Sequence, residues 1–266
     1  MGLRIQDLTK EYGDTTALSG VSFEIPDGSF AVVLGESGAG KSTLLRILNG
    51  LTEPTSGGVY LDGQEITNSR SDVGMVFQQH NLADELSAYD NALTGTFNRT
   101  GFVRSLLNLQ PVEDRELALE ALETVGLLDE AGQRVDRMSG GQQQRVGIAR
   151  ALVQQPALLL ADEPVASLDP ASAEAVMTCF RETAKKRDLT TLASLHQVNI
   201  AREFGEQFIG LKDGEVMFVG SRSELTPSIL EEIYGEIQTE ELREGTETPD
   251  SNEPTQTNAS DIGARL

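Results

Sequence analysis

The chain has 266 residues, a single cysteine, and 42 Asp and Glu against 21 Lys and Arg, for a net charge of −21. No apolar run could span a bilayer, the N-terminus lacks a signal-like stretch, and Cys179 alone cannot form an internal disulfide. We therefore expect a cytoplasmic protein whose charge disfavours nonspecific binding to nucleic acid or anionic lipid. The dispersed acidity is typical of proteins from a high-salt cytoplasm, with an ordinary acidic protein as the alternative.

Apolar patterning predicts an α/β fold with an insertion between its strands. A helix is expected from Lys41 to Gly50 and another near Pro170. Residues 83–152 are mainly helical in pattern, with one helix starting near Pro111 and stopping at Gly126, and we expect them to form a helical subdomain. Strands, some joined by tight turns at Asp-Gly, are expected at 3–12, 17–25, 30–35, 57–66, 157–162, 190–196 and 209–220.

The C-terminal stretch differs in composition from the rest. From Gln238 onward the chain is rich in Glu, Thr, Asn, Ser and Pro and nearly free of apolar side chains. Such a segment cannot bury enough apolar surface to fold. We expect one domain over 1–237 and a disordered acidic tail over 238–266.

A phosphate-binding loop is predicted between a strand and a helix. GESGAGKS, residues 35–42, fits G-x-x-x-x-G-K-[ST] directly after FAVVL. Its N–H groups and the helix N-terminus can surround phosphate oxygens, while Lys41 would contact the β- and γ-phosphates and Ser42 would bind Mg²⁺. A glycine-rich turn without a ligand is the alternative. The residues expected to bind nucleotide are Gly35, Glu36, Ser37, Gly38, Ala39, Gly40, Lys41, Ser42 and Thr43.

Two carboxylates follow the apolar strand ALLLAD. Asp162 and Glu163 would lie at the C-terminal edge of a parallel sheet, where the ligand sites of α/β proteins are found. We expect Asp162 to hold Mg²⁺ and Glu163 to deprotonate the water that attacks the γ-phosphate. A strand that simply ends in polar residues before Pro164 is the alternative.

A second glycine-containing loop, MSGGQQQRV, opens another helix. Ser139 and Gln142 have the spacing of a capping box, which could explain the pair as helix architecture. Gly140 and Gly141 lower the stability of a first helical turn. Their presence is understandable if exposed N–H groups and the helix dipole face an anion there. Since the first loop already surrounds one nucleotide, we expect this loop to contact the ATP of a second copy in a two-fold symmetric dimer.

These motifs together resemble the nucleotide-binding subunits of ABC transporters over about residues 1–235. GESGAGKS resembles their Walker A loop, LLLADE their Walker B strand, and MSGGQ their signature, with Met138 in place of the usual leucine. The resemblance implies a P-loop NTPase core with a RecA-like parallel sheet, an N-terminal antiparallel β subdomain and an inserted helical subdomain. ATP and Mg²⁺ are the implied ligands.

Four further site residues follow from the same resemblance. Tyr12 matches the aromatic residue that stacks on adenine, with a buried strand tyrosine as the alternative. Gln78 matches the glutamine that contacts Mg²⁺, although its neighbour Gln79 is a second candidate. Asp169 matches a loop that crosses the dimer interface, and it could equally be an ordinary N-cap. His196 matches the histidine that contacts the γ-phosphate. The implied catalytic residues are therefore Lys41, Gln78, Glu163 and His196.

Within the family, EPVASLDP, SLHQV, LTGT and NRTGFVRSLLNL resemble the ATP-binding subunits of phosphonate importers. This implies a peripheral protein on the cytoplasmic face of the membrane. Its implied partners are a second copy, two membrane permeases and, indirectly, an extracytoplasmic binding protein for phosphonate or a related phosphorus oxyanion. Phosphate, phosphite and polar amino acids remain open as solutes.

Non-transport ATPases of the same superfamily are less consistent with the sequence. A DNA-maintenance ATPase would need a long heptad insertion, and the acidity disfavours DNA binding. A ribosome-acting relative would normally carry two nucleotide cassettes in one chain, whereas only one is present here.

Overall fold

The computed structural model describes residues 2–66, 72–78, 81–97 and 111–244, with side chains up to residue 235. The stretch NRTGFVRSLLNL, Gln79 and His80 lie outside the described residues, as does the tail after Glu244.

A mixed sheet is the centre of the fold. Its strands lie in the order β10-β9-β3-β8-β7-β6, all parallel except β10, which pairs antiparallel with β9. The strands are β3 (Phe30–Leu34), β6 (Val73–Val76), β7 (Leu158–Asp162), β8 (Thr190–Ser194), β9 (Gln207–Lys212) and β10 (Glu215–Ser221). The expected strands at 30–35, 157–162, 190–196 and 209–220 are confirmed.

β3 is buried on both of its faces. Phe30, Val32 and Leu34 belong to one apolar core, while Ala31 and Val33 belong to the other. A strand covered on both sides has a continuous apolar sequence rather than an alternating one, which explains FAVVL. Each core therefore holds part of the strand that leads into the phosphate loop.

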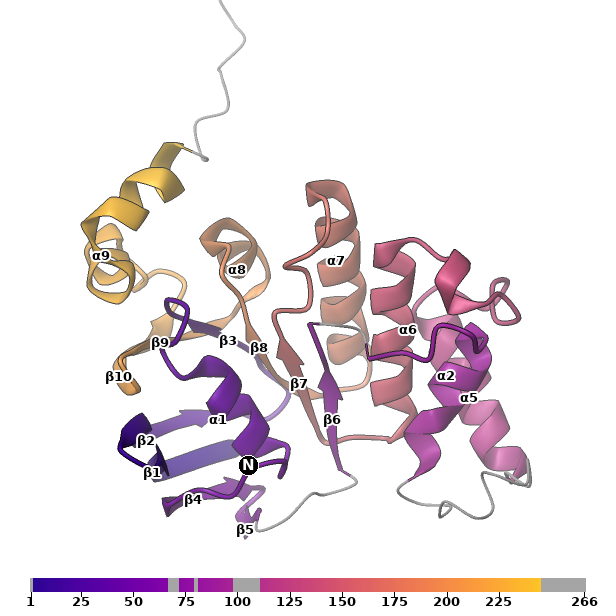
Figure 1. The fold of residues 1–266 in the computed structure, drawn as a ribbon, viewed down its shortest axis with the longest axis horizontal. Coiled ribbons are helices and arrows are strands. Elements are labelled where there is room, and N and C mark those ends of the chain that lie inside the picture. The colour runs from indigo at the N-terminus through magenta and orange to yellow at the C-terminus, as the bar shows by residue number, and fades with distance from the viewer. Residues whose placement is uncertain (1, 67–71, 79–80, 98–110, 245–266) are drawn as a thin grey trace, which may run out of the picture.

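The core that includes Ala31 and Val33 lies between the parallel sheet and a separate antiparallel sheet. The antiparallel sheet has the order β2-β1-β4-β5, and α1 lies between the two sheets (Figure 1). Leu44, Leu45 and Leu48 of α1 are fully buried there, and each such side chain contributes about 1.5–3 kcal/mol to folding. These elements are β1 (Leu3–Tyr12), β2 (Thr15–Ile25), β4 (Ser56–Leu61), β5 (Gln64–Glu65) and α1 (Lys41–Leu48).

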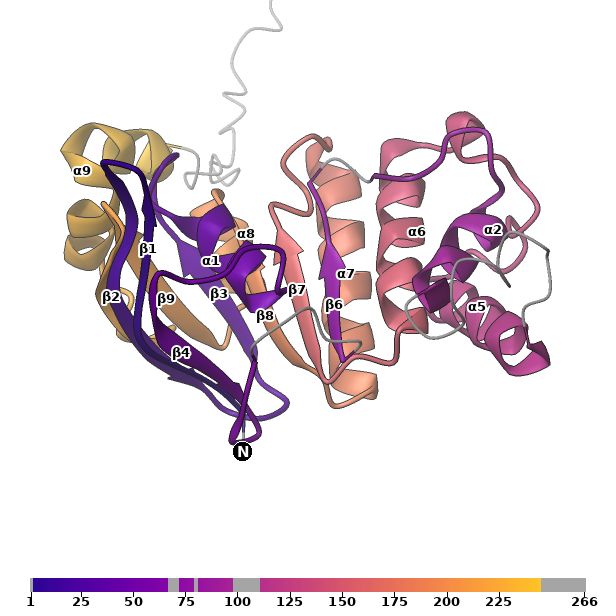
Figure 2. The same ribbon diagram turned by 60° about the horizontal axis from the view of Figure 1, so that its bottom comes forward.

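The core that includes Phe30, Val32 and Leu34 covers the opposite face of the parallel sheet. α7 and α8 lie along it, and α6 connects it to α2 and α5, which form the outer end of the molecule (Figure 2). This arrangement confirms a helical subdomain inserted between β6 and β7. The helices are α2 (Ala88–Leu93), α5 (Val112–Thr124), α6 (Gly140–Val153), α7 (Pro170–Lys186) and α8 (Val198–Phe204), with 3-10 turns at Thr94–Thr96 and Val135–Arg137.

The C-terminal helix α9 (Pro227–Glu244) is interrupted at Gly235, where φ is 75° and ψ is 168°. Leu230, Ile233 and Tyr234 are buried before the interruption. After the interruption the backbone continues as helix to Glu244. The predicted domain boundary at 237 falls within this helix, and most of the predicted tail lies outside the described residues.

Candidate nucleotide-binding and hydrolysis site

The loop between β3 and α1 requires glycine at both of its ends. A Cβ atom at Gly35 would lie 2.4 Å from the carbonyl oxygen of Leu211. Gly40 has φ of +103°, and a Cβ atom there would lie 2.7 Å from the carbonyl oxygen of Ala17. The backbone thus passes through positions that no side chain could occupy. The result is an exposed turn at Ser37 and Gly38 whose N–H groups an anion can approach.

Lys41 begins α1 and is almost fully buried beside this loop. Its ammonium group donates to the carbonyl oxygens of Gly35 at 2.7 Å and Glu36 at 2.9 Å. Burial lowers the pKa of Lys41, and the nearby carboxylates of Glu163 and Asp162 oppose that effect. Because both acceptors are neutral backbone groups, a phosphate oxygen could take their place.

Three oxygen-bearing side chains meet at Asp162, the last residue of β7. The hydroxyls of Ser42 and Ser194 donate to the same carboxylate oxygen of Asp162, at 3.1 Å and 2.9 Å. Mg²⁺ is typically held in proteins by one or two carboxylates, hydroxyls and substrate phosphates. A hydroxyl at the base of the phosphate loop beside a carboxylate therefore fits that ion.

Glu163 adopts a left-handed backbone conformation with φ of 47°. Its N–H donates to the Ser194 hydroxyl at 2.9 Å, and its carboxylate lies 2.5 Å from Nε2 of His196. The turn thus points the Glu163 carboxylate toward the residue after β8. A carboxylate held in this way can act as a general base, with the imidazole fixing its orientation.

Ser194 was not predicted as a site residue, although it links the two carboxylate residues. Its hydroxyl is fully buried, donates to Asp162 and accepts from the backbone of Glu163. A polar residue at the end of the otherwise apolar strand TTLAS, next to β7, is the sequence signal that could have identified it.

Gln78 and Tyr12 have no described hydrogen bond to this network. Gln78 is exposed and follows β6 by two residues, and the register pair of Val76 with Ala161 places it at the edge of the sheet that carries Asp162. Tyr12 is 49% exposed at the end of β1. The alternative of a buried strand tyrosine is therefore wrong, and the ammonium of Lys10 lies over the ring, 4.9 Å from its centroid.

The second loop forms the predicted capping box. The Ser139 hydroxyl accepts from Gln142 N–H at 3.3 Å, and the Gln142 side chain accepts from Ser139 N–H at 3.0 Å. Both glycines have ordinary negative φ values, so neither needs the conformational freedom of glycine. A Cβ atom at Gly141 would make only ordinary contacts, 3.5 Å and more, so packing within the chain does not explain that glycine.

Asp169 lies beside this second loop and not in the network around Lys41. It is the N-cap of α7 and accepts from the N–H of Ser172 at 3.1 Å, and hydrogen bonding to Ser172 lowers the pKa of its carboxyl. Gly140 faces Leu168, and Gly141 faces Ser172. The site residues thus form two groups. None of the described hydrogen bonds joins these two groups.

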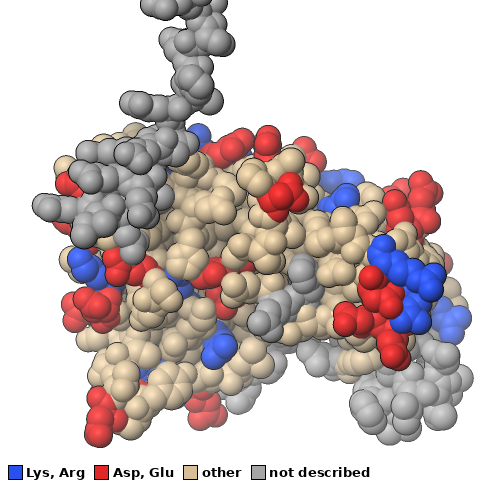
Figure 3. Space-filling model, turned by 45° about the horizontal axis from the view of Figure 1, so that its top comes forward, with Lys and Arg blue, Asp and Glu red and all other residues tan. Residues whose placement is uncertain are grey.

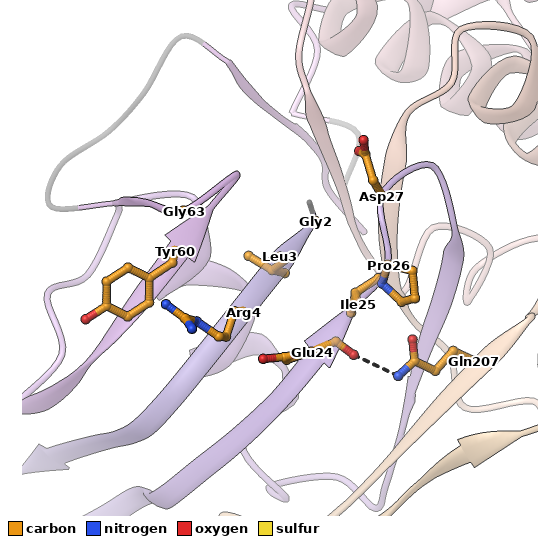
Figure 4. Close-up of a pocket in the computed structure, with 10 residues that line it drawn as sticks. All are labelled: Gly2, Leu3, Arg4, Glu24, Ile25, Pro26, Asp27, Tyr60, Gly63 and Gln207. Carbon is orange, nitrogen blue, oxygen red and sulfur yellow. Dashed lines mark hydrogen bonds between the residues drawn. The ribbon is translucent and has the colours of Figure 1, made fainter.

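A cavity of about 620 Å³ lies elsewhere, beside the antiparallel sheet and the turn between β2 and β3 (Figure 4). Arg4 lies over the ring of Tyr60, and the Gln207 amide donates to the carbonyl oxygen of Glu24. The turn precedes β3, so the cavity is at the amino end of that strand, opposite the phosphate loop. It therefore offers no alternative position for the predicted nucleotide.

Across the parts of the chain with described structure, no helix combines the length and apolarity that crossing a bilayer requires. Acidic side chains are spread over the face in Figure 3, with basic ones interspersed among them.

Comparison with known proteins matches these features. Residues 18–166 match the family described as ABC transporter. The phosphonates import ATP-binding protein PhnC of Halobacterium salinarum is 62% identical over 253 residues, covering 95% of this chain and 90% of that protein. The protein of that name from Thiobacillus denitrificans is 49% identical over 238 residues, covering 87% of this chain and 92% of that protein.

Solved structures agree with the fold. A dimeric ATP-binding cassette in a post-hydrolysis state, bound to ADP and Pi, is 37% identical with a TM-score of 0.69, covering 83% of this chain and 98% of that chain. A nucleotide-free ATP-binding cassette from an ABC transporter is 25% identical with a TM-score of 0.77, covering 91% of this chain and 98% of that chain. The chain belongs to the ABC transporter family, as one of its ATP-hydrolysing cassettes.

Proposed function

We propose that this chain powers the import of phosphonate or a related phosphorus oxyanion by hydrolysing ATP beneath separate membrane permeases. The observation that carries the ATPase part is the continuous network from Ser42 through Asp162 and Ser194 to Glu163 and His196. The names of relatives that share up to 62% identity support the phosphonate part.

In this proposal the phosphate loop, from Gly35 to Thr43, binds the triphosphate. Lys41 transfers its hydrogen bonds from the loop carbonyls to the phosphates, and Tyr12 stacks on adenine. Ser42, Asp162 and Gln78 would hold Mg²⁺, which would neutralise charge on the phosphates when bound.

The hydrolytic step is assigned to Glu163. Its carboxylate accepts a proton from the attacking water, while the Ser194 hydroxyl holds the Glu163 N–H and His196 holds the carboxylate in place. His196, with a side chain 40% exposed, remains open to a γ-phosphate.

The second group of residues is assigned to the partner's nucleotide. Ser139, Gly140, Gly141, Gln142 and Asp169 have no described hydrogen bond to the network around Lys41, and the exposed Ser139 caps the helix end that would face the partner. We propose that two copies face each other so that this surface closes over the ATP of the other copy. The chain itself would sit at the cytoplasmic face of the membrane, held there by the permeases.

The test is transport-coupled hydrolysis in high salt. The chain is reconstituted in proteoliposomes with its permeases and solute-binding protein, and ATPase activity is measured with methylphosphonate, phosphate, phosphite or a polar amino acid. Stimulation by methylphosphonate above the others is expected. Stimulation only by an amino acid would contradict the proposed solute class, and equal activity of the Glu163→Gln chain would contradict the proposed site.

A further inference from the structure

The described part of the C-terminal helix contacts the first residue of the phosphate loop. The N–H of Gly35 donates to the hydroxyl of Tyr234 at 3.2 Å, although the two residues are 199 positions apart. Both residues are buried, so water cannot replace this bond. The remainder of the network described above does not include Tyr234.

The segment that carries Tyr234 is fixed at each of its last residues before the interruption at Gly235. The Lys212 ammonium donates to the carbonyl oxygen of Glu232 at 2.8 Å. Ile233 packs over Gly210, where a Cβ atom would come within 2.4 Å of its side chain. Tyr234 then reaches the loop. The helix α9 is thus attached to β9, the neighbour of β3 (Figure 1). Its Tyr234 hydroxyl lies at the end of β3.

The two sides of the Gly35 residue are held by different groups. Its carbonyl oxygen accepts from Lys41, and its N–H donates to Tyr234. In the proposed function, Lys41 turns to the phosphates when ATP binds and releases that carbonyl. The Gly35 N–H is buried against Tyr234 and so does not face the phosphates, which lets this bond persist when ATP binds.

The hydroxyl of Tyr234 can accept the same hydrogen bond at every working pH. Burial raises the pKa of Tyr234 to about 12, so the side chain stays neutral across the range in which the protein would work.

We propose that Tyr234 is a positioning residue for ATP binding. Its hydroxyl holds the Gly35 N–H, so that the first residue of the phosphate loop keeps the same position with and without nucleotide. This inference rests on the proposed nucleotide role of the loop. It assigns to the C-terminal helix a direct part in the affinity for ATP.

The test compares Tyr234→Phe with Tyr60→Phe. Each change removes one hydroxyl, but Tyr60 lies on β4, where its ring contacts Arg4 and not the loop. In Tyr234→Phe the Gly35 N–H is left buried without a partner, and we expect the dissociation constant for ATP to rise about 5- to 10-fold while kcat at saturating ATP changes less than twofold. Tyr60→Phe is expected to match the wild type in both quantities.

The outcomes separate this inference from the proposed function. If the wild type binds ATP and Lys41→Ala does not, but a folded Tyr234→Phe binds as tightly as the wild type, the positioning role is wrong and the proposed function stands. If the wild type itself fails to bind ATP, the proposed function is wrong.

A measurement on the unaltered protein keeps the inference testable should Tyr234→Phe not fold. Amide hydrogen exchange is followed in the wild type without nucleotide. The Gly35 amide is expected to be protected as strongly as the amides of β3. Exchange of Gly35 as fast as that of the exposed Ser37 would show that the bond to Tyr234 does not hold the loop, and would overturn the proposal.

Discussion

Gly141 at the start of α6 faces Ser172 of α7, and a Cβ atom added at 141 would lie 3.5 Å from the Ser172 Cβ. A side chain at 141 would therefore point into its own chain and not toward a partner. The exposed residue that caps the same helix, Ser139, is the better place to introduce charge.

We expect Ser139→Asp to prevent ATP-driven dimer formation and Ser139→Asn to permit it. Both side chains can accept from the Gln142 N–H, so both preserve the helix cap. Only Asp places a negative charge where the partner's phosphates are proposed to lie. The measurement is light scattering of each variant in a Glu163→Gln chain with ATP. Equal dimer in the two variants would mean that this loop is only a helix cap.

Glu163→Gln should bind ATP but lower kcat by about 10²–10⁴-fold, since the amide can still contact His196 but cannot accept a proton from water. Single-turnover hydrolysis and ATP titration measure the two quantities. Glu65→Gln, on the exposed strand β5, is the matched control and should retain full activity. If Glu163→Gln hydrolyses ATP near the wild-type rate, Glu163 is not the general base.

Ser194→Ala should lower kcat about tenfold and leave ATP affinity within about threefold of the wild type. The change removes the hydroxyl that accepts from Glu163 N–H and donates to Asp162, so both residues lose orientation. Thr191→Val, on the same strand, removes a buried hydroxyl that donates to the Leu189 carbonyl oxygen instead. Equal kcat values for the two variants would indicate a general packing effect on β8 and no role for Ser194 in the site.

ATP affinity should decline with rising pH at values below those expected for an ordinary lysine. Burial lowers the pKa of Lys41, so its ammonium loses the proton sooner as pH rises, and the charge that attracts the phosphates is lost with it. Titration calorimetry with ATP at several pH values between 7 and 10 measures the dissociation constant and so follows the decline. Lys41→Arg should bind more weakly at pH 7 but without that decline, because a guanidinium keeps its charge.

Removing residues 245–266 should leave both ATP hydrolysis and the melting temperature unchanged at matched salt. That segment holds four acidic residues and one basic residue, so the net charge changes by three, from −21 to −18. Ending the chain at Thr226 instead removes the buried side chains of Leu230, Ile233 and Tyr234 and should abolish folding or activity. If the chain without residues 245–266 melts at a lower temperature than the full chain, those residues contribute to the stability of the fold.

Local sequence was sufficient for features that depend on neighbouring residues. The turn between β3 and α1, the end of β7 at Asp162 and the cap at Ser139 each depend on only a few consecutive side chains, and the structure has each of these local features where the sequence predicts it. The bonds of Ser194 to two other residues and of Tyr234 to Gly35 depend on tertiary contacts, which no single stretch of sequence contains.

The missed strand β6 shows the same limit. Glycine at 74 lowers the propensity for a strand and hid the pattern VGMV. In the fold this glycine gives room to α6, because a Cβ atom there would lie 3.1 Å from the carbonyl oxygen of Ala151, a tight contact. The close packing of α6 against β6 thus favours a residue that weakens the strand pattern in the sequence.

The two faces of β3 have a consequence for how the molecule unfolds. Because one short strand contributes side chains to both apolar cores, neither core can lose its order while the other keeps an intact boundary. The antiparallel layer and the helix-covered layer should therefore melt in one calorimetric transition. Nucleotide bound at the end of that strand would raise the midpoint of the whole transition, so heat capacity measurements on this cassette would report ligand occupancy through a region far larger than the binding loop.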